Sequence, residues 1–198
     1  MSNPLPDDID PGSLSRLPLL KRSDLDADGQ CVYDMVFGRE RLSPLPGPGG
    51  ISMYSPKVAE AMHIMNTSLR TAGVLSPRFS EIAILVAARE INQQYEWTLH
   101  EPAARRAGAT DAVIEAIKYD RDVAGLAAED SLIIRVGRQL LREHRLSSDL
   151  YAEAVQRFGQ RGMVELSALI GDYVMAGIML HAADQHLPPE RPALLPMR

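Results

Sequence analysis

Residues 76–90 have the sequence SPRFSEIAILVAARE, and they carry the clearest helix signal in the chain. Ser76 can cap a helix N-terminus, and Pro77 suits the first helical position because its missing N–H would have no partner there. Apolar residues then recur at three- and four-residue spacing from Phe79 to Val86, as on one face of a helix. We therefore predict a helix that begins at Pro77 and buries this face.

Similar start and stop signals predict helices along most of the chain. The stretch LSPLPGPGGISMYS, residues 42–55, is expected to be non-helical because its prolines remove backbone donors. No segment shows the two-residue alternation typical of a strand. The sequence predicts an all-α fold, a single-domain bundle of about seven or eight helices. The other predicted helices run from Ser23 to Gly38, Ser55 to Gly73, Thr110 to Ile117, Glu129 to His144, Ser147 to Gly159 and Gly162 to Asp184. Thr110 is the predicted cap of its helix.

Proline-rich stretches at both ends divide the chain into three parts. Residues 1–22 hold four prolines without periodicity, and we expect an arm that is disordered or lies on a neighbouring surface. Residues 23–185 form the predicted helical domain. Residues 186–198 hold four further prolines and are expected to be an extended tail that can wrap a partner subunit.

Composition narrows the classes of partner. The 198 residues suffice for one domain with a buried core. The chain has 21 Lys and Arg against 26 Asp and Glu, and it has no run of basic residues that could bind the phosphate backbone of a nucleic acid. The single cysteine, Cys31, excludes an intrachain disulfide and favours a reducing, cytoplasmic setting. Residues 163–180 approach the length of a membrane span but contain Glu165 and Asp172, so we predict a core helix and no membrane partner.

The stretch YEWTLH, residues 95–100, places Glu96 four residues before His100. On a helix the two side chains share a face, so the carboxylate can hold and polarise the imidazole. Glu81 precedes Glu96 by 15 residues, which is about 22 Å along one continuous helix. A break at residues 92–94 would instead fold a hairpin that brings Glu81 against the pair. The sequence leaves both arrangements open.

Such a group of two acids and a histidine can transfer protons, because imidazole titrates near neutral pH and burial raises the pKa of a carboxyl group. The plainer alternative is a solvated surface pair. Tyr95 and Trp97 flank the pair and are candidate substrate contacts, with core packing as the alternative. Asp172 and Tyr173 could line the site or supply a hydrogen bond to a neighbouring subunit, with a buried tyrosine whose hydroxyl is satisfied as the simpler alternative. The spacing of the other histidines predicts no metal site.

The segment SEIAILVAAREINQQYEWTLHEPAARRAG, residues 80–108, resembles the carboxymuconolactone decarboxylase-like superfamily, which includes the alkylhydroperoxidase D group. ELSALIGDYVMAGI, residues 165–178, extends the resemblance, which covers roughly residues 40–185. The resemblance implies an alkylhydroperoxidase D-like helical fold. It also implies a homo-oligomer, a trimer or hexamer, with sites near the subunit interfaces.

The resemblance further implies a chemistry. The cysteine positions of the family's peroxidases correspond to Gln93 and Glu96, so the thiol pair of a peroxide-reducing enzyme is missing. In the decarboxylase branch a glutamate commonly lies four residues before the histidine, as Glu96 does here. That branch acts without a metal or organic cofactor on a small carboxylated lactone.

We therefore predict a cofactor-free acid–base enzyme, a decarboxylase-type lyase or an isomerase, with a small carboxylated or lactone metabolite as substrate. In this hypothesis His100, oriented by Glu96, moves a proton at the carbon next to a carbonyl, and Glu81 is a second proton relay. Two alternatives remain. One is a peroxiredoxin-like oxidoreductase of the same superfamily without the thiol pair, and the other is a binding or assembly protein without catalysis.

Overall fold

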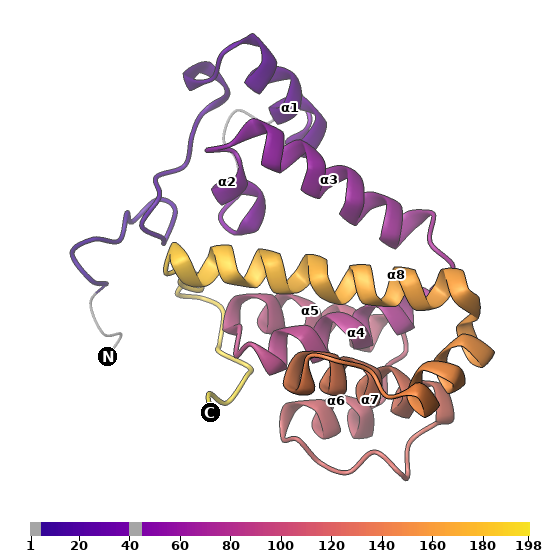
Figure 1. Ribbon diagram of the computed structural model, residues 1–198. Helices are drawn as coiled ribbons and strands as arrows, with labels where there is room; N and C mark the ends of the chain where they lie inside the picture. Colours follow the sequence, from indigo (N-terminus) through magenta and orange to yellow (C-terminus); the bar gives the residue numbers. More distant parts are fainter. Residues whose placement is uncertain (1–4, 40–44) are drawn as a thin grey trace. The chain divides into compact units, whose positions relative to one another are not determined.

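The computed structural model describes residues 5–39 and 45–198 (Figure 1). Over these residues the chain forms eight α-helices and one short 3-10 helix and has no β-strand, which confirms the all-α prediction. The elements are η1 (Arg22–Asp24), α1 (Ala27–Phe37), α2 (Pro48–Ser52), α3 (Pro56–Thr71), α4 (Pro77–Glu90), α5 (Gln94–Arg106), α6 (Asp111–Lys118), α7 (Ala128–Glu143) and α8 (Ser148–Ala182).

The predicted capping residues start their helices as expected. The Ser76 side chain accepts a hydrogen bond from the backbone N–H of Phe79 at the start of α4. The Thr110 side chain accepts one from Val113 at the start of α6. Each cap satisfies a backbone donor that a helix N-terminus leaves without a partner, so these boundaries follow from local sequence.

The expectation for the proline-rich stretch 42–55 is partly wrong. Pro48 begins the five-residue helix α2, because proline needs no partner for a backbone donor at a first helical position. Residues 42–44 lie outside the described residues. The predicted helix end at Gly159 is present as a break inside α8, where Gly159 has φ 72° and ψ 171°.

Contacts divide the chain into two compact units. The first comprises Met1–Met65 and Ala176–Pro192, and the second comprises Asn66–Met175 and Ala193–Arg198. The boundaries therefore fall within α3 and α8. Each unit has its own buried cluster of apolar side chains.

In the first unit, Val32, Tyr33, Met53 and Ala59 form the buried cluster. The described part of the predicted N-terminal arm is ordered on its own chain. The backbone N–H of Arg16 donates to the Ala183 carbonyl, and that of His186 donates to the Leu14 carbonyl. Residues 1–4 of the arm lie outside the described residues.

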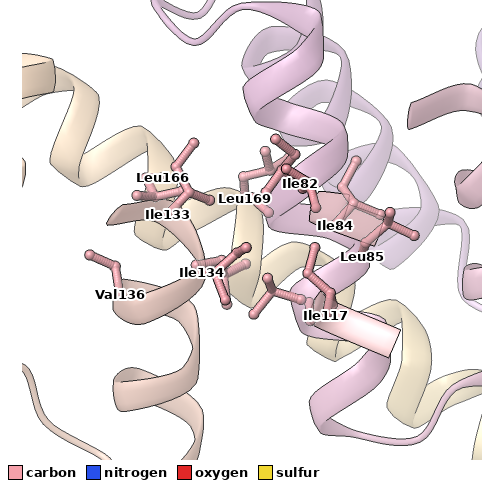
Figure 2. Packing of buried hydrophobic residues seen from close by; sticks show 14 of the residues in the cluster. Ile82, Ile84, Leu85, Ile117, Ile133, Ile134, Val136, Leu166 and Leu169 are labelled. Atoms are coloured by element: carbon pink, nitrogen blue, oxygen red, sulfur yellow. The ribbon is translucent and has the colours of Figure 1, made fainter. Parts of the chain in front are cut away.

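The second unit is built around α4, whose residues 80–89 are all buried. This helix packs against α5, α6 and α7. Figure 2 shows the apolar side chains that meet there, and burying them supplies the main driving force for holding α4 in place. The labelled residues are Ile82, Ile84 and Leu85 of α4, Ile117 of α6, Ile133, Ile134 and Val136 of α7, and Leu166 and Leu169 of α8.

Helix α8 is long and apolar enough to cross a membrane by length and composition alone, since its most apolar 18-residue window has a mean hydropathy of 1.6. Half of that window is buried inside the protein. Leu166, Leu169 and Ile170 of α8 belong to the core of the second unit. Their packing is that of a core helix, as the acidic residues of this segment led us to expect.

The C-terminal residues of the second unit contact α4 and α5 of their own chain. Leu195 is buried in the core, and the Arg89 guanidinium donates to the Pro196 carbonyl at 2.6 Å. The backbone N–H of Leu194 donates to the Thr98 hydroxyl at 3.4 Å. This part of the predicted tail is therefore held by the second unit itself.

Replacing Gly137 with alanine is expected to destabilise the protein by about 1–3 kcal/mol. Gly137 lies where α7 meets α4, and an added Cβ would come within 2.6 Å of Val86 Cγ1. Val86 yields poorly because a β-branched side chain on a helix has one strongly preferred rotamer. Urea denaturation measures the effect. Gly171→Ala is the control, since no described atom beyond its chain neighbours and its own helix backbone lies within 4 Å of the added Cβ. A Gly137→Ala protein as stable as this control would contradict the packing.

Candidate active site

A sharp turn joins α4 to α5 and forms the hairpin that the sequence left open. Helix α4 ends at Glu90 and α5 begins at Gln94, and Asn92 between them has the left-handed φ of 58°. The Gln93 side chain accepts a hydrogen bond from the backbone N–H of Tyr95 at 2.8 Å and caps α5. The single continuous helix is thereby excluded, and the two helices lie side by side (Figure 1).

The hairpin brings together the three residues predicted to form the site. His100 Nδ1 lies 2.7 Å from Glu81 Oε2, and His100 Nε2 lies 3.4 Å from Glu96 Oε2. The side chains of Glu81, Glu96 and His100 are 6%, 3% and 12% exposed. A buried imidazole with a carboxylate at each ring nitrogen differs from the solvated surface pair considered as the alternative.

Arg70 and Tyr173 extend this cluster. Arg70 Nη2 donates to Glu81 Oε1 at 2.7 Å, and its Nη1 donates to the Tyr173 hydroxyl at 3.2 Å. The Tyr173 ring meets the His100 ring edge-on, with the ring centroids 5.0 Å apart. Burial raises the pKa of Tyr173 above its usual range, so its hydroxyl stays neutral.

A further carboxyl group, Asp172, lies beside the cluster. Its Oδ2 accepts a hydrogen bond from the Asn66 amide at 2.8 Å, and the residue is 3% exposed. Burial raises the pKa of Asp172 and the charge of Glu96 raises it further, against the lowering effects of the Asn66 hydrogen bond and the Arg70 charge. Glu96 Oε1 is buried without a hydrogen-bond partner among the described residues. A buried carboxylate oxygen in this state can accept a proton or a hydrogen bond from a bound molecule.

Sequence reasoning missed Arg70 and Asn66. They lie four residues apart on α3, so they share a helix face, but nothing in their local sequence marks that face as part of a site. Only the packing of this helix end against Glu81, Asp172 and Tyr173 reveals their part in the cluster.

The environment of His100 favours its charged form. Burial lowers the pKa of His100, but hydrogen bonding and charge interaction with Glu81 and Glu96 outweigh it and raise the pKa from 6.5 to about 8. At pH 7 the imidazolium form therefore predominates. This form donates from both ring nitrogens, so the site holds an available proton at neutral pH.

We expect the pH dependence of stability to report this raised pKa. The folded-state pKa of His100 lies above its ordinary value of 6.5. Its contribution to the free energy of unfolding, about 2 kcal/mol, is therefore fully present below pH 6.5 and is lost as the pH rises through 8. Imidazole NMR titration measures the pKa directly, and urea denaturation at pH 6 and pH 9 measures the stability.

Glu81→Gln is the matched variant for this measurement, because it keeps the size of the side chain and removes its charge. We expect the variant to lower the pKa of His100 and to reduce the stability difference between pH 6 and pH 9. An unchanged pKa would show that the contact between Glu81 and His100 does not control the proton.

The flanking aromatic residues lie in buried positions. Trp97 is completely buried in the core of the second unit, and its indole N–H donates to Glu101 Oε2 at 2.6 Å. Lys118 Nζ lies 5.6 Å from its ring centroid. Tyr95 is 6% exposed. Substrate contact by Tyr95 or Trp97 stays a prediction.

Within residues 5–39 and 45–198, no group of three or more His, Cys, Asp or Glu side chains is arranged to hold a metal ion. His100 and its two carboxylate neighbours can transfer protons.

The fold and the site define a class of protein, the all-helical proteins with a buried Glu–His–Glu cluster on a helical hairpin. Residues 56–133 match the family described as the carboxymuconolactone decarboxylase family. The match confirms the resemblance over these residues. The matched segment contains Arg70, Glu81, Glu96 and His100. A search of curated proteins found no match.

Proposed function

We propose that this protein is a cofactor-free acid–base enzyme, of the decarboxylase or isomerase type, that acts on a small carboxylated or lactone metabolite. The observation that carries the proposal is the convergence of Glu81, Glu96 and His100 in a buried cluster. General acid–base catalysis requires a group with a pKa near the working pH within hydrogen-bond reach of the reacting atom. The pKa of His100, about 8, meets the first condition.

The geometry supports specific roles for the two glutamates. The contact between His100 Nδ1 and Glu81 is the shorter, and Arg70 holds the other oxygen of the same carboxylate. Glu81 is therefore suited to orient the ring, as the carboxylate of a catalytic triad does. Nε2 is the nitrogen that can meet a substrate, and Glu96 beside it is suited to relay the proton. This reverses the roles assigned from the sequence, where Glu96 oriented His100 and Glu81 relayed.

In a decarboxylation, the bond between the substrate and its carboxylate carbon breaks and carbon dioxide leaves. The electron pair passes into the neighbouring carbonyl system as an enolate. The Nε2–H of imidazolium His100 then gives its proton to the carbon that lost the carboxylate. Glu96 returns a proton from solvent to the neutral ring. One proton is consumed for each carbon dioxide released. An isomerase would use the same groups to remove a proton from the substrate and return it at another position.

The proposal is tested by incubating the purified protein in deuterated water with a panel of small carboxylated lactones and oxo acids. We expect one panel member to release carbon dioxide or to take up deuterium from the solvent at the carbon next to its carbonyl. Proton NMR monitors both changes. Deuterium at this carbon reports that a proton from the exchangeable pool, which includes the proton on His100, was delivered there.

A protein with His144→Gln is the matched control for the same assay. His144 is exposed and lies outside the cluster, so this variant should behave as the wild type. Absence of both carbon dioxide release and deuterium exchange across the panel would count against the acid–base function. Turnover unchanged by loss of His100 would count against the site.

The peroxidase alternative requires a thiol nucleophile, and the site contains none. Gln93 and Glu96 occupy the places of the two thiols, and Cys31, the single cysteine of the chain, lies on α1. Thiol-dependent peroxide reduction that continues at full rate in Cys31→Ser would support an external thiol donor. We expect no such reduction.

A further inference from the structure

The last six residues of the chain, 193–198 with the sequence ALLPMR, belong to the second unit. We call them the C-terminal strap. Leu195 is 3% exposed and lies in the core of this unit, and Leu194 packs against the same core. Burial of a leucine side chain is a strong driving force for so short a segment. The strap is therefore bound to the second unit in the way that a peptide ligand is bound.

The main chain of the strap is held by the beginning of α5. The Gln94 carboxamide donates to the Leu195 carbonyl at 2.6 Å and accepts from the Leu195 N–H at 3.1 Å, with its amide oriented to satisfy both groups. The backbone N–H of Leu194 donates to the Thr98 hydroxyl at 3.4 Å. Main-chain hydrogen bonds beside a buried side chain are a common way for proteins to bind extended peptides.

The next residue of the strap contacts the end of α4. Arg89 is 1% exposed, and its Nη1 donates to the Pro196 carbonyl at 2.6 Å. Arg89 Nε is buried without a partner among the described residues. A buried donor without an acceptor costs free energy, and loss of the strap would take a close acceptor from a guanidinium that already has one such donor. Arg89 thus ties the strap to α4.

The end of the strap contacts the turn between the two helices. Asn92 Nδ2 donates to the Arg198 carbonyl at 3.4 Å, and the Arg198 backbone N–H donates to Asn92 Oδ1 at 3.5 Å. Asn92 has the left-handed φ of 58°, a conformation that residues other than glycine adopt at a cost in free energy. The strap therefore contacts α4, the turn and α5 through successive residues.

This bridge lies on the hairpin that assembles the candidate active site. Glu81 lies on α4, eight residues before Arg89, and His100 lies on α5, two residues after Thr98. A helix transmits a displacement as a nearly rigid element, so a shift between the helices at the turn also moves Glu81 relative to His100. A hydrogen bond is lost beyond about 3.5 Å, so a shift of about 1 Å would break the 2.7 Å contact between Glu81 Oε2 and His100 Nδ1.

We infer that the C-terminal strap is a positioning segment of the candidate active site, which joins α4 to α5 and fixes the distance between Glu81 and His100. The surface of the hairpin that holds the strap is a binding site for an extended peptide, and the chain's own end is its ligand. The effect on turnover rests on the proposed acid–base function. Binding of the strap and its effect on His100 are measurable without a substrate.

The test uses full-length Leu195→Ser, which removes the buried side chain of the strap. Amide hydrogen exchange, followed by NMR, reports whether the strap is bound. We expect the Leu194 amide to exchange about tenfold to a hundredfold faster in the variant, the range expected from losing one buried leucine. Imidazole NMR titration reports on the site. We expect the pKa of His100 to fall from about 8 toward its ordinary value of 6.5 as the contact with Glu81 loosens.

Two further variants of the strap are matched controls. Met197→Ser changes a side chain that is 60% exposed and takes no part in these contacts, so it should leave both measurements as in the wild type. Leu195→Met keeps an apolar side chain of similar volume and should retain the slow exchange and the raised pKa of His100. Thermal unfolding shows whether each variant is folded.

Gln94→Ala opens the same contact from α5 and serves if Leu195→Ser is not folded. It should change both measurements in the same direction, and the double variant should differ little from Leu195→Ser because both changes act through one contact. Additive changes in the pKa of His100 would overturn the inference, since Gln94 would then act on the site without the strap. Fast exchange of the Leu194 amide with an unchanged pKa of His100 would also overturn it, as would exchange as slow as in Met197→Ser.

The strap and the proposed function fail independently. A lowered pKa of His100 in Leu195→Ser, without turnover of any panel substrate by the wild type, would retain the strap and reject the proposed function. Turnover by the wild type that Leu195→Ser retains at full kcat, with the pKa of His100 unchanged, would retain the function and reject the strap.

Discussion

His100→Gln is expected to lower kcat by about 10²–10⁴-fold on any substrate that the wild type converts. Glutamine retains a polar side chain of similar reach but cannot donate or accept a proton as an acid or base near neutral pH. The loss should fall on kcat more than on KM, because the proton is transferred in the transition state. Steady-state kinetics on the substrate found by the deuterium exchange screen measures both constants.

The two glutamates provide a graded comparison for this prediction. Glu81→Gln should lower kcat and shift the basic limb of its pH profile downward, because the pKa of His100 falls when a partner charge is removed. Glu96→Gln should lower kcat through loss of the relay. If His100→Gln keeps the kcat of His144→Gln, the imidazole does not take part in the chemistry.

Trp97→Ala is expected to lower the free energy of unfolding by about 3–5 kcal/mol. Trp97 is completely buried in the core, so its removal loses packing contacts and leaves a cavity. It also removes the N–H that donates to the buried carboxylate of Glu101. Guanidinium chloride denaturation, analysed for both midpoint and slope, measures the effect.

Trp97→Phe distinguishes packing from substrate contact. Phenylalanine restores much of the buried area but not the donor, and we expect a loss of about 1–3 kcal/mol with KM unchanged. A raised KM in a variant of wild-type stability would instead support the predicted substrate contact by Trp97.

Much of the helix pattern could be predicted because helix ends depend on nearby residues. Ser76 and Thr110 cap the helices that follow them, and both were identified from the sequence alone. Pro48 was misjudged for a related reason, since a proline that ends one segment can equally begin another. Its effect depends on whether the residues after it find partners in the folded protein.

The candidate site was predictable only where its residues share one helix. Glu96 and His100 are four residues apart, so helical geometry alone placed them on one face. Their burial was not predictable, because it depends on the helices packed around them. The roles of the glutamates depend on the two distances from the imidazole, and only the tertiary structure provides these.

The sequence by itself determined the all-helical class, the capped starts of α4 and α6, and the pairing of Glu96 with His100, since each depends on residues within a few positions of one another. The tertiary structure alone decided that Glu81 meets His100, through a turn in which Asn92 adopts a left-handed backbone. It alone added Arg70, which lies 30 residues before His100 and reaches the cluster because the end of α3 packs there. Contacts between distant residues arise when helices bury their apolar faces together, and that packing is a property of the whole fold.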